Sequence, residues 1–156
     1  MRIYIIISLL FFSLCDPIFA QTKENKSINW LTFEQLSDSL NVHPKKVLLF
    51  FHTDWCSYCK KMMKETFMNQ AIVDKINQEY YAVHFDAESI ETVQFDNAIF
   101  EHPNKQKIRG KYHPIATLLM PQKQAIFPTI MILDGDFKVK NVTQKYLSSH
   151  NFNKIL

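Results

Sequence analysis

Two cysteines three positions apart, Cys56 and Cys59, are the residues of this chain best suited to chemistry. A thiolate is a strong nucleophile, and a second thiol within reach can displace whatever the first has bound. In thiol–disulfide exchange, Cys56 would attack a disulfide sulfur, a mixed disulfide would form, and Cys59 would resolve it. The spacing therefore predicts a redox-active pair, with Cys56 attacking and Cys59 resolving.

The segments on either side of the pair indicate how it is held. Residues 47–51 are an apolar run of strand length, typical of a strand buried on both faces. A helix is expected over 56–68, so that free backbone N–H groups and the positive end of the helix dipole lower the pKa of the Cys56 thiol. Cys59, one turn further on, is expected to be the more buried cysteine. The apolar residues at helical spacing on one face are Cys59, Met63 and Phe67.

Other uses of a Cys-x-x-Cys pair have less support. A zinc site would need further ligands, but there is no second cysteine pair, and His52 and His84 lack a ligand spacing. Covalent haem attachment needs a histidine after the second cysteine, where this chain has Lys60. A structural disulfide that closes so short a loop adds little stability. Metal handling stays open as an alternative.

Residues 50–62 resemble the active-site segment of the thioredoxin superfamily. A second segment, 126–129 (Ile-Phe-Pro-Thr), resembles the cis-proline loop of that superfamily, and the matching region spans about 47–142. Residues 64–67, with a following strand that ends in Asp86, are similar to exported thioredoxin-like proteins related to the C-terminal domain of the transmembrane reductase DsbD.

The resemblance implies a fold class and a set of site residues. The fold would be α/β and thioredoxin-like, a central mixed β-sheet flanked by helices, with an inserted β-hairpin region around 89–112. Cys56 and Cys59 would be catalytic, and neither a cofactor nor a metal is expected. A cis Pro128 would place the Phe127 backbone beside Cys56, where an extended substrate strand can pair with it. The residues expected to bind substrate are Trp55, Ser57, Tyr58, Phe127 and Pro128.

The chain also departs from the superfamily pattern. Many thioredoxins have a buried carboxylate beneath the cysteine pair and a lysine on the next strand, and the matching positions here hold Phe50 and, near the expected place, Ala82. Asp54 and Glu65 are close in sequence, but both are expected to be solvated. The sequence therefore identifies no general base for Cys59.

The N-terminus has the pattern of an export signal. A short basic start is followed by an apolar stretch at 3–12 and a small residue, Ala20, so residues 1–20 are expected to be a cleaved signal peptide that includes Cys15. Residues 21–27 are polar and are expected to be a flexible leader. The protein would then be exported and periplasmic; the alternative is a membrane anchor formed by the uncleaved segment.

Composition narrows the remaining possibilities. The chain of 156 residues is 47% hydrophobic and 13% aromatic, enough for one core, and residues 28–156 are expected to form a single thioredoxin-like domain. It has two glycines, which excludes glycine-rich phosphate loops. The formal net charge is +3 without a basic cluster interleaved with aromatic residues, so nucleic-acid binding is not expected.

Local patterns predict the other elements. Thr32 and Gln35 form a capping box at the start of a first helix, after a short strand at 28–31. Further helices are expected at 71–78, 113–119 and 151–156, the last capped by Ser149, and further strands at 81–85, 130–133 and 138–142. In the insertion, segments 92–95 and 98–101 flank Asp96-Asn97, a typical two-residue hairpin turn. The insertion is either a solvated excursion or an element that helps to select a protein partner.

These observations predict an exported protein thiol–disulfide oxidoreductase. Its partners would be protein substrates, bound through transient mixed disulfides, and a membrane electron donor. The Ser57-Tyr58 dipeptide lacks the histidine found beside the second cysteine of strong oxidants, which favours a reductase. The alternatives are a non-catalytic binding module or chaperone with the same fold, and a metal-handling protein.

Overall fold

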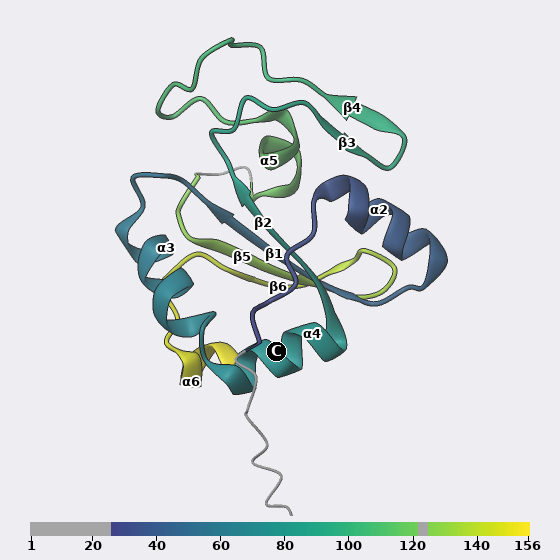
Figure 1. Ribbon diagram of the computed structural model, residues 1–156. Helices are drawn as coiled ribbons and strands as arrows, with labels where there is room; N and C mark the ends of the chain where they lie inside the picture. The colour runs from purple at the N-terminus through teal and green to yellow at the C-terminus, as the bar shows by residue number, and fades with distance from the viewer. Residues whose placement is uncertain (1–25, 122–124) are drawn as a thin grey trace, which may run out of the picture.

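A four-stranded mixed sheet lies at the centre of the molecule (Figure 1). The computed structural model describes residues 26–121 and 125–156. The strands follow the order β2-β1-β5-β6, in which β1 is parallel to β2 and antiparallel to β5, and β5 is antiparallel to β6. Their bounds are β1 Lys46–His52, β2 Tyr80–Asp86, β5 Thr129–Leu133 and β6 Val139–Thr143. The predicted α/β class with a mixed central sheet is confirmed.

Strand β1 divides the core into two layers. Leu48 and Phe50 face one hydrophobic cluster, whereas Val47, Leu49 and Phe51 face the other. All five are at most 1% exposed, because β1 has a strand on each side and helices over both faces. This burial explains why the sequence of β1 is a continuous apolar run rather than an alternating one.

Helices cover both faces of the sheet (Figure 1). Buried side chains of the cysteine-containing helix, the helix after it and the C-terminal helix pack on the Phe50 face. The first helix, the helix after the insertion and the inserted hairpin pack on the Phe51 face. The elements of the Phe50 face are α3 Ser57–Lys61, η1 Met62–Thr66, α4 Gln70–Glu79 and α6 Ser149–Asn153; those of the Phe51 face are α2 Phe33–Val42, α5 Pro114–Leu119, β3 Val93–Phe95 and β4 Ala98–Phe100.

The helix after the cysteines differs from the regular α-helix that the sequence predicts. After Lys61 it widens into the π-helical turn η1, in which the Phe67 N–H donates to the Met62 carbonyl. The wider turn changes which side chains point inward. Met62 and Thr66 are fully buried, and Met63, predicted on the buried face, is only half-buried. Phe67 is buried as expected.

Two other predictions need correction. Residues 28–31 do not form a strand, because only Trp30 makes a bridge, to Ala82 of β2. The cap of the last helix is Ser148 rather than Ser149, and this helix ends at Asn153. The leader predicted at 21–27 lies mostly outside the described residues; its last two residues, Lys26 and Ser27, are hydrogen-bonded to side chains of α4. The signal peptide predicted at 1–20 lies wholly outside them.

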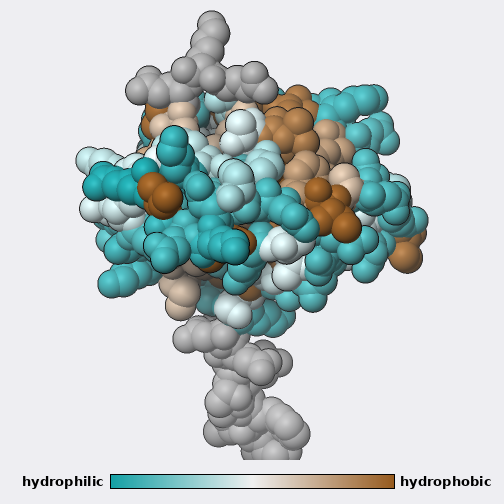
Figure 2. Space-filling view, turned by 90° about the horizontal axis from the view of Figure 1, so that it is seen from above, coloured by the Kyte–Doolittle hydropathy of each residue, from teal (hydrophilic) through white to brown (hydrophobic). Residues whose placement is uncertain are grey.

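The insertion forms the predicted hairpin and packs on the domain. Asp96 and Asn97 both have positive φ angles, as a type I′ turn requires. The ring of Phe95 packs against Phe33 of α2, 5.5 Å between centroids, and the Asp96 N–H donates to the Ser37 hydroxyl. The hairpin is therefore anchored on α2 rather than extended freely into solvent. Figure 2 looks down on this side of the molecule, which is mostly hydrophilic with separate hydrophobic patches.

The capping box of α2 gives a first test of the fold. The Thr32 hydroxyl accepts from the Gln35 N–H at 3.2 Å, and the Gln35 side chain accepts from the Thr32 N–H at 2.9 Å. Replacing Thr32 with Ala should lower the free energy of unfolding by about 1 kcal/mol, as for other N-caps, when measured by urea denaturation. Ser39→Ala, inside the same helix, is the control and should leave stability unchanged or slightly higher. Equal effects of the two substitutions would contradict the role of the cap.

Candidate active site

The cysteine pair lies where β1 ends and α3 begins, and it forms a disulfide. Cys56 is the N-cap of α3, and its sulfur accepts a hydrogen bond from the Cys59 N–H at 3.1 Å. This N–H has no carbonyl partner inside the helix, so it is available to stabilise negative charge on the Cys56 sulfur. Both cysteines are nearly buried in the disulfide form, Cys56 4% and Cys59 2% exposed. Cys59 is the more buried of the two, as predicted, but the difference is small.

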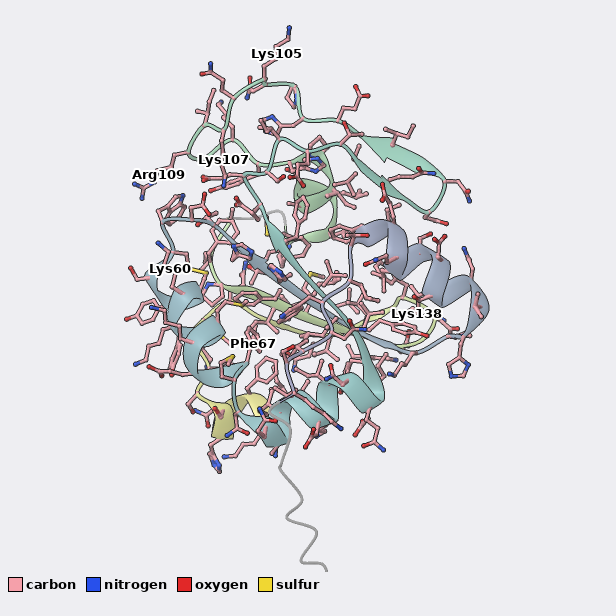
Figure 3. The ribbon with its side chains drawn as sticks, in the orientation of Figure 1. Lys60, Phe67, Lys105, Lys107, Arg109 and Lys138 are labelled. Carbon is pink, nitrogen blue, oxygen red and sulfur yellow. A yellow bond between two sulfur atoms is a disulfide. The ribbon has the colours of Figure 1, made fainter. Side chains whose placement is uncertain are left out.

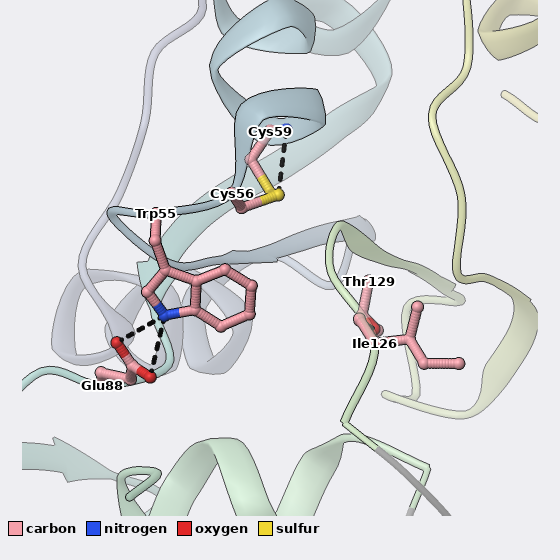
Figure 4. Close-up of a disulfide and its surroundings, with 6 residues drawn as sticks. All are labelled: Trp55, Cys56, Cys59, Glu88, Ile126 and Thr129. Atoms are coloured by element: carbon pink, nitrogen blue, oxygen red, sulfur yellow. Dashed lines mark hydrogen bonds between the residues drawn. A yellow bond between two sulfur atoms is a disulfide. The ribbon is translucent and has the colours of Figure 1, made fainter. Parts of the chain in front are cut away.

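Trp55, next to Cys56, is held by a buried carboxylate (Figure 4). Its indole N–H donates to both oxygens of Glu88, at 3.1 and 3.0 Å. Glu88 is only 3% exposed and also accepts from the Gly110 N–H at 2.6 Å. One carboxylate thus joins the active-site loop to the far end of the insertion and fixes the indole ring, which is 41% exposed.

The basic part of the insertion borders the same loop. The guanidinium of Arg109 lies 4.4 Å from the centre of the Trp55 ring, and Figure 3 shows Arg109 and Lys107 at the same end of the molecule as Lys60. The Lys107 ammonium bridges Asp54 of the active-site loop and Asp86 at the end of β2. Its hydrogen bond holds the pKa of Asp54 below the usual value. Burial alone would lower the pKa of Lys107, but its bonds to the two carboxylates raise it.

The Phe127–Pro128 loop lies across from the disulfide. The peptide bond is cis, as predicted. Thr129, directly after it, is the register partner of Phe51 near the end of β1, which brings the loop to the same edge of the sheet as the cysteines (Figure 4). The Phe127 ring packs edge-on against Trp55 at 5.9 Å and against Tyr112 of the insertion at 5.5 Å.

Ser57 and Tyr58 lie on the outer surface between the two cysteines. Both are exposed, and Tyr58 has 62% of its surface accessible. The Tyr58 ring lies 5.9 Å from that of Tyr146, whose hydroxyl donates to Glu65. Glu65 therefore points along the surface and does not reach the sulfurs, as expected from sequence.

The floor beneath the pair is aromatic. Phe50 stands where many thioredoxins have a buried carboxylate. It is fully buried, and its ring packs edge-on against Phe67 at 4.9 Å. Asp54 is solvated as expected, with 72% of its side chain exposed. Neither it nor Glu65 is a buried carboxylate.

Two histidines, His52 and His84, lie next to Phe50 and to each other. His52 stacks on Phe50 at 5.8 Å, and its Nε2 lies 3.2 Å from Nδ1 of His84 on the neighbouring strand. Burial lowers the pKa of both imidazoles, and the mutual proximity lowers that of His52 further. His52 and Cys59 line one pocket, together with Thr53, Asp54, Lys60, Met63 and Lys64.

Two kinds of feature are not found in the described part of the chain. Within 26–121 and 125–156, no group of three or more His, Cys, Asp and Glu side chains is arranged to hold a metal ion. No helix in these ranges is long and apolar enough to span a membrane.

The model of the thioredoxin-like domain family matches residues 34–156. This chain belongs to that family. The matched residues include the disulfide, the Phe127–Pro128 loop and the insertion. A search of curated proteins gave no match.

Solved structures have the same fold. The DsbH oxidoreductase has a TM-score of 0.60 at 16% identity, over 90% of each chain. A thioredoxin from Thermus thermophilus has a TM-score of 0.58 at 14% identity, over 83% of this chain and 85% of its own. A disulphide isomerase from Xylella fastidiosa has a TM-score of 0.52 at 15% identity, over 90% of this chain and 95% of its own. The fold and the Cys56–Cys59 disulfide together support thiol–disulfide oxidoreductase activity.

Several residues at the site were missed from the sequence. Glu88 and Arg109 contact Trp55, Lys107 pairs with the adjacent Asp54, and His52 lines a pocket together with Cys59. The position of Glu88 could have been expected. Strands β1 and β2 are parallel, so their carboxyl ends meet at one edge of the sheet, and residues just after Asp86 lie near the cysteines that follow His52. Nothing in the sequence placed the basic segment of the insertion on Trp55.

Proposed function

We propose that this protein is a thiol–disulfide oxidoreductase that reduces exported proteins. The observation that supports this best is the Cys56–Cys59 disulfide at the start of α3, with the Phe127–Pro128 loop opposite it, in a member of the thioredoxin-like family. Reduced Cys56 attacks one sulfur of a substrate disulfide, and the electron pair of that bond leaves on the other sulfur, which takes up a proton. Cys59 then attacks the Cys56 sulfur, closes the Cys56–Cys59 bond and releases the second substrate thiol.

The proposed substrate surface surrounds the disulfide. Trp55 and Tyr58 are partly exposed on either side of Cys56, and Ser57 is exposed between the cysteines. Phe127 and Pro128 lie opposite, and an extended substrate segment would pair with the backbone of this loop. In this proposal, these five residues contact the substrate while the sulfurs exchange.

The proposed cycle needs a source of electrons outside this chain. Each substrate disulfide reduced leaves one Cys56–Cys59 disulfide, which a dithiol donor must reopen. For an exported, periplasmic protein we propose a membrane-bound donor. An uncleaved anchor at the N-terminus would place the protein beside such a donor without changing the chemistry.

The reduction potential of the pair tests the direction of electron flow. A strong oxidant needs a very stable thiolate, and here Ser57-Tyr58 provides no histidine between the cysteines. We expect a potential nearer to about −270 mV, as in thioredoxin, than to about −120 mV, as in DsbA. Equilibration in glutathione buffers, followed by Trp55 fluorescence or by the mass added on alkylation, measures it. A potential near that of DsbA, with rapid oxidation of a reduced unfolded protein, would make the protein an oxidase.

A further inference from the structure

The resolving step requires a proton acceptor for the Cys59 thiol. Cys59 is 2% exposed, and a buried thiol loses its proton less readily than a solvated one. The thiolate is nevertheless the species that attacks. A base that reaches Cys59 would therefore speed resolution and would return the proton when the disulfide is reopened.

The carboxylates near the site do not meet this need. Asp54 is exposed and paired with Lys107. Glu65 lies on the surface with Tyr146. Glu88 is held by the Trp55 indole and the Gly110 N–H. Of these three, only Asp54 lines the pocket beside Cys59, and its low pKa makes it a weak base.

His52 is placed on the correct face of the sheet. Side chains alternate along β1, so His52 points to the same side as Phe50, the side that is covered by α3. His52 and Cys59 line a single pocket of about 230 Å³. A water molecule takes up about 30 Å³ in the liquid, so this pocket has room for water to bridge the two groups.

His84 completes the arrangement. Its Nδ1 lies 3.2 Å from His52 Nε2, within hydrogen-bonding distance. A hydrogen bond between these two nitrogens determines whether the other nitrogen of His52, Nδ1, carries a proton. When His52 Nε2–H donates to His84, the Nδ1 of His52 has a free lone pair. The edge contact of the Trp30 ring, 5.0 Å from that of His84, holds the second imidazole in place.

We infer that His52 is the proton acceptor for Cys59, with His84 as its positioning residue. The inference rests on the proposed function and deepens it. In the resolving step, the Cys59 thiol transfers its proton across the pocket to His52 Nδ1. The Cys59 thiolate attacks the Cys56 sulfur, the bond between Cys56 and the substrate breaks, and its electron pair leaves on the substrate sulfur. On reopening of the disulfide by a donor dithiol, the imidazolium returns its proton to Cys59.

Burial, more than the neighbouring charges, keeps His52 in the neutral form that this role requires. Burial lowers its pKa, His84 and Lys107 lower it further, and Asp86 and Asp54 act in the opposite direction. Because the net shift is downward, His52 is neutral and able to accept a proton at pH 7, and it becomes protonated only as the pH falls. The titratable or charged groups that face it are His84, Asp86, Asp54 and Lys107, and the other charged residues that line the shared pocket are Lys60 and Lys64.

The test isolates the resolving step with a small aromatic disulfide, dithiobis(nitrobenzoate). The reduced protein releases one coloured thiolate when Cys56 attacks and a second when Cys59 resolves, so stopped-flow absorbance separates the two steps. His52→Gln should slow the second release by about tenfold to a hundredfold at pH 7, in the range of general-base effects. The first release should change less than twofold. His150→Gln, on the exposed face of α6, is the matched control and should match the wild type.

The pH profile distinguishes a proton acceptor from a residue with a structural role. In the wild type, the rate of the second release should fall as the pH drops through the His52 pKa, and His52→Gln should lose this inflection. The two proteins should converge only as the pH rises past the pKa of the buried Cys59 thiol, which burial holds above the value of about 8.5 for free cysteine, because the thiol then ionises unaided. An unchanged profile and a rate within twofold of the wild type would overturn the role of His52. Failure of the wild type itself to release a second thiolate would instead overturn the proposed function.

A second measurement does not depend on the folding of a His52 variant. Proton titration by NMR of the reduced wild type and of Cys59→Ser compares the His52 imidazole with and without an ionisable neighbour. In the wild type, we expect the His52 signals to shift a second time as the pH rises through the pKa of Cys59, because a thiolate next to the ring changes its electrostatic surroundings, and Cys59→Ser should lack this second inflection. Identical titration curves would overturn the inference.

Discussion

Replacing Cys56 with Ser is expected to abolish disulfide reduction. The hydroxyl of serine cannot form a mixed disulfide, and removal of a covalent nucleophile typically costs a factor of about 10³ or more in rate. Turbidity from the reduction of insulin by dithiothreitol measures the loss. Ser57→Ala removes an exposed hydroxyl of the proposed substrate surface but no sulfur, so it should lower the rate far less than Cys56→Ser does, by no more than about threefold.

Cys59→Ser should give the complementary result. Cys56 can still attack, but no thiol resolves the product, so mixed disulfides with substrate proteins should accumulate and be isolable on non-reducing gels. Complexes formed through Cys59 in the Cys56→Ser protein would reverse the two roles. If unfolded proteins bind both variants and the wild type equally, and none of the three forms a mixed disulfide, the protein is a binding module or chaperone with this fold.

The sequence predicted those parts of the site that depend on local geometry. An apolar run followed by Cys-x-x-Cys and a helical pattern leaves few arrangements, and Cys56 is indeed the N-cap of α3 at the end of β1. The turn at Asp96-Asn97 was predictable for the same reason, since residues that tolerate positive φ between two short apolar segments favour a hairpin. Both predictions rest on neighbours in the chain.

The parts that could not be predicted depend on long-range contacts. Glu88 and Trp55 are 33 positions apart, and only the parallel pairing of β1 with β2 brings them together. The contact between Arg109 and Trp55 depends on the path of an irregular segment, for which hydrophobic periodicity gives no information. The π-helical turn at Met62–Thr66 similarly reflects tertiary packing, since the Thr66 hydroxyl donates to the Leu147 carbonyl at 2.7 Å.

Nothing in the sequence assigned His52 a role in the site. No ligand spacing links it to His84, and the structure holds the two side by side only because β1 and β2 are adjacent. As a metal site the pair is incomplete among the described residues. As a pair of imidazoles within hydrogen-bonding distance, one of which lines a pocket with Cys59, it suits proton transfer.

Replacing Phe50 with Ala should give the largest loss of stability among the substitutions considered. Its ring is fully buried between β1 and the cysteine-containing helix, packed edge-on against Phe67. Truncation leaves a cavity that neighbouring elements fill only in part, and Phe→Ala changes in cores cost about 3–5 kcal/mol. Small domains are stable by only about 5–15 kcal/mol, so the variant should unfold at a much lower urea concentration.

The Phe50→Ala measurement needs a control at an exposed apolar position. Leu118→Ala removes a large apolar side chain that is 60% exposed, and it should change the free energy of unfolding by no more than about 0.5 kcal/mol. A loss below about 1 kcal/mol for Phe50→Ala would mean that the floor beneath the cysteines is not tightly packed. A large loss would show that Phe50, which stands where many thioredoxins have a buried carboxylate, stabilises the fold by packing. Phe50 cannot accept a proton, so proton transfer at Cys59 needs another residue, and we infer that this residue is His52, two positions further along the same face of β1.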